Sequence, residues 1–206
     1  MIRSGFFVSI DGPSGVGKTS VSALLTKKLT SLGQRVVLTA TPSTAELGKL
    51  ARHGTYDYQA ETLTCLVAAD RYHHDRTTVG PAMSTGATVV CDRYVPSSLV
   101  LDPLDGVDSG FVMDLYRRIT VPDIAFILVG EPILCVQRAA ERGRYSRLQP
   151  ADNDGGRREL QSFEAVAELL QRTGYPAQVH DIGAESAEQV ADALAGVILA
   201  KEGERL

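Results

Sequence analysis

The chain has 206 residues, 44% of them hydrophobic and 22% charged, a composition typical of a globular protein and not of a disordered one, so we expect a single domain over residues 1–206. Its 21 basic and 25 acidic residues give a net charge of −4, which does not suggest the basic face of a protein that binds nucleic acid. No run approaches the ~20 apolar residues of a membrane span, and the first residues lack the apolar run of a signal peptide, so we expect a cytoplasmic protein with no membrane partner. The three cysteines are widely spaced and show neither disulfide nor zinc spacing, so we expect their thiols to be reduced.

The first half of the chain alternates short apolar runs, typical of buried strands, with longer stretches whose apolar residues recur at helical spacing. In chain order these predict a strand at 6–10, a helix at 20–32, a strand at 36–38, a helix at 59–83 and a strand at 88–91. Gly33 stops the first helix, Gly80-Pro81 is expected to kink the second, and Gly86 ends it.

The second half continues the same alternation. It predicts a helix at 109–119, a strand at 124–129, a helix at 132–141, a polar irregular segment at 143–156, a helix at 158–172, a strand at 178–182 and a helix at 187–200. Strands that alternate with helices imply parallel pairing, and uninterrupted apolar strands fit a sheet covered by helices on both faces. We therefore expect an α/β fold with its ligands at the carboxyl ends of the strands.

A complete P-loop pattern, Gly-Pro-Ser-Gly-Val-Gly-Lys-Thr, lies between the first strand and the first helix at residues 12–19. Its glycines let successive N–H groups face one anion, and the helix adds its positive end. Lys18 would contact the outer phosphates, and Thr19 would offer a hydroxyl to Mg²⁺. The predicted ATP-binding residues here are Gly12, Pro13, Ser14, Gly15, Val16, Gly17, Lys18, Thr19 and Ser20.

An acid and an arginine follow the third predicted strand. Asp92 occupies the position of a carboxylate that holds Mg²⁺ or its waters, and the Arg93 guanidinium suits phosphate oxygens. A simple hydrolase has no need of this second fixed cation, whereas an enzyme that binds a second phosphorylated ligand does. Arg71, on the long helix, is a further candidate contact for that ligand's phosphate or base.

Four arginines cluster around Gly143: Arg138, Arg142, Arg144 and Arg147. A mobile segment with arginines can close over ATP and neutralise charge in the transition state. Because the P-loop has no basic residue before Lys18, we expect the additional cation to come from this lid, at about residues 143–157, with hinges at Gly143, Gly155 and Gly156.

These motifs together resemble the thymidylate kinase family of nucleoside monophosphate kinases over nearly the whole chain. The P-loop, the segments 68–71 and 92–98, Pro122-Asp123 and the arginines at 138–147 carry the resemblance. It implies a five-stranded parallel sheet of order 2-3-1-4-5, a lid, a homodimer, Mg·ATP as donor and a pyrimidine deoxynucleotide as the small-molecule acceptor. It also implies that Lys18 and Arg93 grip the phosphates, that Arg142, Arg144 or Arg147 is the catalytic lid cation, and that Arg138 or Arg142 stacks on adenine.

The departures from the family fall on the acceptor side. Ala40 stands where many members have arginine, and Val67 where many have a stacking phenylalanine; Leu101 and Asp102 replace the usual Tyr and Gln. An ionised Asp102 can only accept hydrogen bonds, so it would suit the amino group of cytosine and repel the carbonyl of thymine. Hence the acceptor is predicted to be dTMP-like, with a cytosine-type or 5-modified base as the sharper hypothesis. The predicted acceptor-binding residues are Asp11, Val67, Arg71, Arg93, Ser97, Ser98, Leu101 and Asp102.

Two other functions remain open from the sequence. A kinase for a nucleoside or another neutral hydroxyl needs a general base, which Asp11 or Asp92 could supply, although Thr41 stands where related nucleoside kinases have Glu. A nucleotide-dependent binding or switch protein would need neither Arg93 nor a lid.

Overall fold

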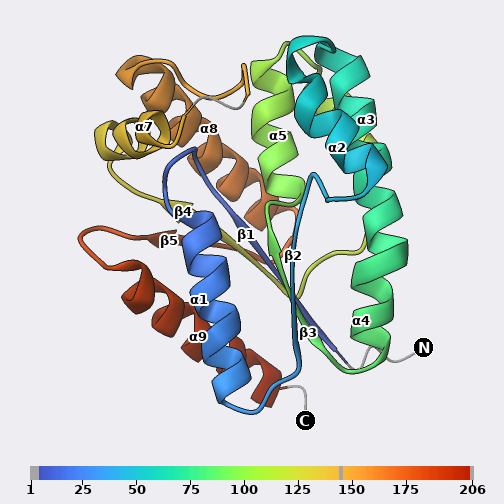
Figure 1. Ribbon diagram of the computed structural model, residues 1–206, viewed down its shortest axis with the longest axis vertical. Helices are drawn as coiled ribbons and strands as arrows, with labels where there is room; N and C mark the ends of the chain where they lie inside the picture. The colour runs from blue at the N-terminus through green and yellow to red at the C-terminus, as the bar shows by residue number, and fades with distance from the viewer. Residues whose placement is uncertain (1–4, 144–145, 205–206) are drawn as a thin grey trace.

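The computed structural model describes residues 5–143 and 146–204 of the chain. Five parallel strands form one sheet in the order β2-β3-β1-β4-β5 (Figure 1). The strands are β1 (Phe6–Asp11), β2 (Val36–Ala40), β3 (Thr88–Asp92), β4 (Ile124–Val129) and β5 (Ala177–Asp181). The predicted α/β class and the strand order implied by the family resemblance are therefore confirmed.

Helices occupy both faces of this sheet. They are α1 (Lys18–Ser31), α2 (Glu46–His53), α3 (Ala60–His74), α4 (Gly80–Ser84), α5 (Val95–Leu104), α6 (Ser109–Leu115), α7 (Pro132–Glu141), α8 (Asn153–Arg172) and α9 (Ala187–Gly203), with short turns of 3-10 helix at Gly54–Tyr56 and π-helix at Asp75–Val79. None of the helices in the described ranges is both long and apolar enough to span a membrane.

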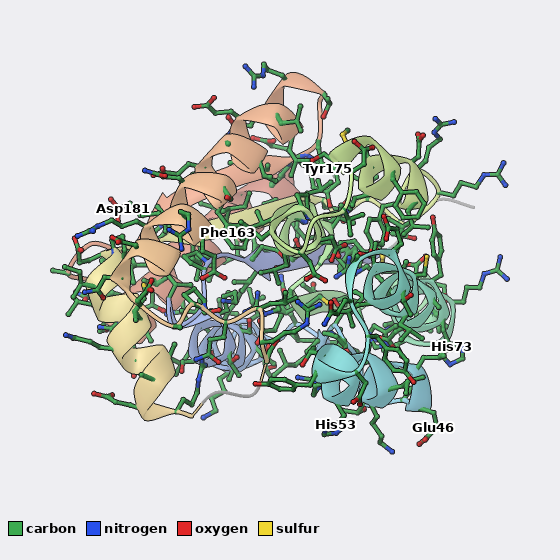
Figure 2. All side chains as sticks on the ribbon, turned by 90° about the horizontal axis from the view of Figure 1, so that it is seen from above. Glu46, His53, His73, Phe163, Tyr175 and Asp181 are labelled. Atoms are coloured by element: carbon green, nitrogen blue, oxygen red, sulfur yellow. The ribbon has the colours of Figure 1, made fainter. Side chains whose placement is uncertain are left out.

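The alternation of side chains along β1 divides the core in two. Phe6, Val8 and Ile10 point to the face covered by α1 and α9, which lie side by side (Figure 1). Phe7 points to the opposite face, where residues of α3, α5, α6 and α8 pack. In Figure 2 Phe163 of α8 lies in this second layer, and its side chain is fully buried. Both layers are mainly aliphatic, and together they hold the carboxyl ends of the strands in place.

Several boundaries differ from the sequence prediction. The long helix predicted at 59–83 corresponds to α3, a π-helical turn and α4, which follow one another directly. Its distortion is the π-helical turn at Asp75–Val79, before Gly80-Pro81. Helix α8 begins at Asn153, so the irregular segment ends at Asp152, whose carboxylate accepts a hydrogen bond from the Gly155 N–H and caps the helix. Consequently Gly155 and Gly156 are helical, and the prediction that they are hinges is wrong.

Two helices were not predicted at all. Helix α2 is only two turns long, and α5 contains two prolines, Pro96 and Pro103. Pro96 lies in the first turn of α5, where its missing N–H is not needed, and the helix ends just after Pro103. Both helices stand at the carboxyl edge of the sheet, and both contribute to the site described next.

Candidate active site

The loop at residues 12–17 is pressed closely against its neighbours. Gly12 has φ +140° and Gly15 φ +83°, conformations that side chains with a Cβ rarely adopt. A Cβ on Gly12 would lie 2.3 Å from the carbonyl oxygen of Leu128, and one on Gly15 would lie 1.9 Å from that of Cys135. The glycines are thus needed for the fold of the loop as well as for anion binding.

Lys18 begins α1 and is buried beneath this loop. Its Nζ donates to the carbonyl oxygen of Pro13 at 2.7 Å, and only 5% of the residue is exposed. Burial, together with the neighbouring Arg93 guanidinium, lowers the pKa of Lys18 to about 7, although Asp92, Glu159 and Asp11 act in the opposite direction. An arriving phosphate anion would favour the charged ammonium.

Thr19 and Asp92 meet at the start of α1. The Thr19 hydroxyl donates to Asp92 Oδ2 at 2.6 Å, while Asp92 Oδ1 is buried without a partner among the described residues. An unsatisfied carboxylate oxygen beside a hydroxyl fits a hard cation. Within the described ranges no group of three or more His, Cys, Asp or Glu side chains could hold a metal. A Mg²⁺ ion here would therefore depend on nucleotide phosphates for much of its coordination.

A cavity of about 800 Å³ opens beside the loop. The predicted site residues on its wall are Ser14, Thr19, Ser20, Val67, Arg71, Asp92, Arg93, Ser97, Ser98, Leu101, Asp102 and Arg142. The structure thus brings part of the P-loop segment, the predicted acceptor residues other than Asp11, and one lid arginine around a single space.

Arg71 is the most deeply buried cation of the cavity, with 2% of its surface exposed. Its guanidinium lies between two aromatic rings, 4.8 Å from the centroid of Tyr116 and 5.5 Å from that of Tyr94. The Nη1 donates to Ser98 Oγ at 2.9 Å and Nη2 to Thr41 Oγ1 at 3.3 Å. These contacts fix the guanidinium plane before any ligand binds.

Arg93 stands in a strained loop after β3. Its φ of +70° is uncommon for a residue with a side chain and is typical of functional sites. Its N–H donates to the Ile10 carbonyl at 2.9 Å, and Nη1 lies 3.4 Å from Ser97 Oγ. Arg93 lines the cavity, close enough to Lys18 to lower the pKa of that ammonium.

Asp11 holds that loop in place and does not lie on the cavity wall. It is fully buried, and its Oδ1 accepts from the N–H of Tyr94, the N–H of Ser97 and the Ser97 hydroxyl at 2.7–3.0 Å, while Oδ2 accepts from Ser9. Because the Asp11 carboxylate accepts these four hydrogen bonds, it holds the loop that contains Arg93 in place. The prediction that Asp11 binds the acceptor is therefore corrected to a role in positioning Arg93.

Asp102 lies on the cavity wall, as the hypothesis of an altered base pocket requires. The residue is 6% exposed, and burial raises the pKa of its carboxyl to about 6, against the lowering effects of Arg71 and of the Ser98 and Thr64 hydroxyls. Its Oδ2 has no hydrogen-bond partner among the described residues. Val67 and Leu101 line the same space.

The lid arginines are dispersed. Arg142 lines the cavity, Arg138 is exposed on α7 away from it, and Arg144 lies outside the described residues. Arg147 forms a two-pronged ion pair with Asp105, which follows α5, and donates to the Tyr58 carbonyl at 3.3 Å. Arg147 is therefore bound to the end of α5 and does not lie on the cavity wall.

Comparisons with known proteins agree with this geometry. A family model described as thymidylate kinase matches residues 10–194. The chain is 35% identical over 177 residues to a thymidylate kinase of Deinococcus radiodurans, covering 81% of this chain and 84% of that one. It is 34% identical over 193 residues to a thymidylate kinase of Clavibacter sepedonicus, covering 85% and 90%. The chain belongs to the thymidylate kinase family. It is accordingly a nucleoside monophosphate kinase, a phosphotransferase, and the resemblance seen in the sequence is confirmed.

The sequence did not predict the part of the cavity that is formed by α2 and the turn after it. Arg52, His53, Thr55 and Tyr56 line the cavity here, and Arg52 Nη2 donates to the Pro42 carbonyl. His53 lies at the outer end of α2, on the periphery of the molecule (Figure 2). No motif marks these residues, and only a prediction of α2 itself could have pointed to them.

Proposed function

We propose that this enzyme transfers the γ-phosphoryl group of Mg·ATP to the phosphate of a pyrimidine nucleoside monophosphate, with ADP and the nucleoside diphosphate as products. The observation that carries this proposal is the presence of two fixed guanidinium groups, Arg71 and Arg93, in the same cavity as the P-loop. They supply charge for a second anionic ligand, beyond what Lys18 and the helix end supply for ATP. The relatives named above, which are thymidylate kinases, support the same reaction.

Mg²⁺ would be held by Thr19 and Asp92, and when bound it neutralises charge on the phosphates of ATP. Lys18 contacts the transferred group from beneath the loop, and Arg93 orients the acceptor phosphate toward it. Arg142, which also lines the cavity, is the described lid arginine placed to add positive charge. The acceptor phosphate is already an anion, so catalysis requires alignment and charge neutralisation and no strong base.

For the acceptor base, we infer a cytosine-type pyrimidine. The ionised Asp102 accepts hydrogen bonds only, which suits an exocyclic amino group and disfavours the 4-carbonyl of thymine. Val67, in place of a stacking ring, leaves room for a substituent at position 5. Arg71 beside Asp102 supplies a donor for the 2-carbonyl that both bases share.

A kinase for a neutral hydroxyl is less well supported. The carboxylates among the described residues of the cavity wall are Asp92 and Asp102, and Asp92 is engaged by Thr19. Asp11, the other base considered, is occupied by four donors. A nucleotide switch would have no use for Arg71 and Arg93 in its cavity.

The test is an ADP-release assay with Mg·ATP and a panel of dTMP, dUMP, dCMP, CMP, 5-hydroxymethyl-dCMP, thymidine and deoxycytidine. We expect the monophosphates to react and a cytosine-type monophosphate to have the highest kcat/KM. Asp102→Gln should shift preference toward dTMP, whereas the exposed control Asp114→Asn should leave the ranking unchanged. If dTMP is best and D102Q has no effect, the inference about the base is wrong while the kinase stands. If only thymidine and deoxycytidine react, the proposed reaction is wrong.

The homodimer implied by the family resemblance remains a prediction. Sedimentation equilibrium of the purified chain would test it.

A further inference from the structure

The tip of the phosphate-binding loop is bonded to a helix far away in the sequence. Glu159 of α8 accepts two hydrogen bonds from Ser14, one from its backbone N–H at 3.0 Å and one from its hydroxyl at 3.2 Å. Glu159 is only 1% exposed. The pair joins positions 145 residues apart, between the variable part of the P-loop and the second turn of α8.

The same tip is held on its other side by α7. The carbonyl of Cys135 lies so close to Gly15 that a Cβ there would come within 1.9 Å of its oxygen. Helices α7 and α8 also pack against each other at Gly156, where a Cβ would lie 2.4 Å from Val136 Cγ2. The loop tip is therefore held between two helices, and the segment that connects them, residues 142–152, overlaps the lid predicted at about residues 143–157.

Bonds within the loop carry this attachment on to Lys18. The Val16 N–H and the Lys18 ammonium both reach the carbonyl oxygen of Pro13, at 3.3 Å and 2.7 Å. Pro13 directly precedes Ser14, so a displacement of Ser14 moves the carbonyl that holds the Lys18 side chain. A short path thus runs from Glu159 through Ser14 and Pro13 to Lys18.

A side chain needed only to fill space at this position would be apolar, because burying a carboxylate costs free energy that hydrogen bonds must offset. Two hydrogen bonds from one residue to one carboxylate fix both the distance and the orientation of that residue. The carboxylate also directs the Ser14 N–H toward α8.

From this geometry we propose that Glu159 is a positioning residue for ATP: through its two hydrogen bonds to Ser14 it sets the P-loop tip, and with it Lys18, relative to the helices that flank the lid. Donor binding and phosphoryl transfer then depend on Glu159, whereas acceptor binding does not. The proposal rests on the proposed function in one respect, that ATP is the donor bound at this loop.

The experiment compares Glu159→Ala and Glu159→Gln with the wild type, and uses Glu164→Ala as a matched control, since Glu164 is exposed on the same helix. Three quantities are measured: the Kd for ADP by calorimetry, the KM for ATP with kcat, and the KM for the best acceptor. Gln can still accept from the Ser14 N–H and can donate to its hydroxyl, so it keeps the geometry without the charge.

We expect E159A to weaken ADP binding and raise the KM for ATP about tenfold, a change of about 1.4 kcal/mol, which is within what hydrogen bonds to a charged group contribute. Its kcat should fall as well, with the acceptor KM within twofold of the wild type. E159Q should recover most of both losses, and E164A should resemble the wild type.

Folded E159A with a lower melting temperature but unchanged ADP Kd and ATP KM would overturn the proposal and leave Glu159 a purely structural residue. E159Q as defective as E159A would overturn it too, because charge and not hydrogen-bond geometry would then matter. If E159A does not fold, Ser14→Ala decides between the same outcomes, with a threefold weaker ADP Kd expected and an unchanged one contradicting the proposal. A wild-type protein that binds no ADP would instead refute ATP as the donor.

Discussion

The two halves of the active site are built in different ways. The donor half, where we propose that ATP binds, is made by one contiguous loop and the first turn of α1. The acceptor half gathers side chains from α2, α3, α5 and the loop after β3, with lid residues closing one side. A backbone site tolerates little change because its geometry is set by glycines in tight contact. A side-chain site can be altered one residue at a time, and we propose that Val67, Leu101 and Asp102 are changes of that kind.

The largest effect should come from the donor half. We expect Lys18→Met to lower kcat by about 10³-fold, comparable to the loss of a preorganised charge-stabilising group elsewhere. The melting temperature of the empty protein should rise, because the substitution removes a buried ammonium. Steady-state kinetics and thermal denaturation check both, with the exposed Lys27→Met on the same helix as control. A K18M enzyme that retained a tenth of its activity would mean that the loop works through its backbone alone.

The acceptor half should respond next most strongly. Arg71→Lys keeps the charge but loses the planar group that stacks between Tyr94 and Tyr116 and bonds Ser98 and Thr41. We expect kcat/KM for the acceptor to fall about 10²-fold, in line with loss of a buried charged contact, while the Kd for ADP stays unchanged. Arg76→Lys, exposed in the π-helical turn after α3, is the control. A comparable loss of ADP affinity in R71K would show that the two halves are not separable.

The choice of base should depend on pH through Asp102. Because burial raises the pKa of this carboxyl to about 6, it is protonated and able to donate below pH 6, and ionised and only accepting above it. The ratio of kcat/KM for dCMP to that for dTMP should therefore rise about tenfold between pH 5 and 7.5, which corresponds to about 1.4 kcal/mol. Both acceptors carry the same phosphate, so its titration cancels in the ratio. Asp102→Asn should flatten the profile, and a ratio that does not change with pH in the wild type would remove Asp102 from base selection.

The same shift has a consequence for stability. A carboxyl whose folded-state pKa lies above its ordinary value favours folding in its protonated form, so this contribution is full below about pH 4 and is lost as pH rises through about 6. Thermal denaturation of D102N should accordingly show stabilisation relative to the wild type at pH 7.5 and none at pH 4.

The smallest effect should come from the ion pair that joins the lid to the acceptor half. Asp105 also accepts from the N–H of Ala60 at the start of α3, so the Arg147–Asp105 pair connects the lid to α3 and α5 together. We expect Asp105→Asn to raise the acceptor KM about threefold without changing the KM for ATP, as for other contacts that hold a lid. A double-mutant cycle with Arg147→Met measures the coupling. The same change in the exposed pair of Asp114 and Arg117 should have no effect on either KM.

How well the sequence predicted the site follows from how each part is built. The P-loop, Asp92 and Arg93 are marked by contiguous motifs at strand ends, so their place in the fold could be predicted. Asp11 shares that position in the sequence, yet its carboxylate turns inward to the N–H groups of Tyr94 and Ser97, and only the folded chain shows where it points. The α2 residues Arg52 and His53 belong to a helix too short for its apolar spacing to be recognised. No motif marks Glu159, because its partner Ser14 lies 145 residues earlier in the sequence.

The burial of Arg71 bears on how the enzyme would behave in different ionic environments. Dissolved ions screen charges over about 8 Å at physiological ionic strength, but they act far less on charges that water cannot reach. The Arg71 guanidinium, enclosed by Tyr94, Tyr116 and the hydroxyls of Ser98 and Thr41, is shielded in this way. Arg142, the described lid arginine on the cavity wall, is exposed and has no such protection. Rising salt should therefore slow the capture of ATP long before it weakens the grip on the acceptor, and a cell that changes its internal salt would alter the rate of this kinase more than its choice of substrate.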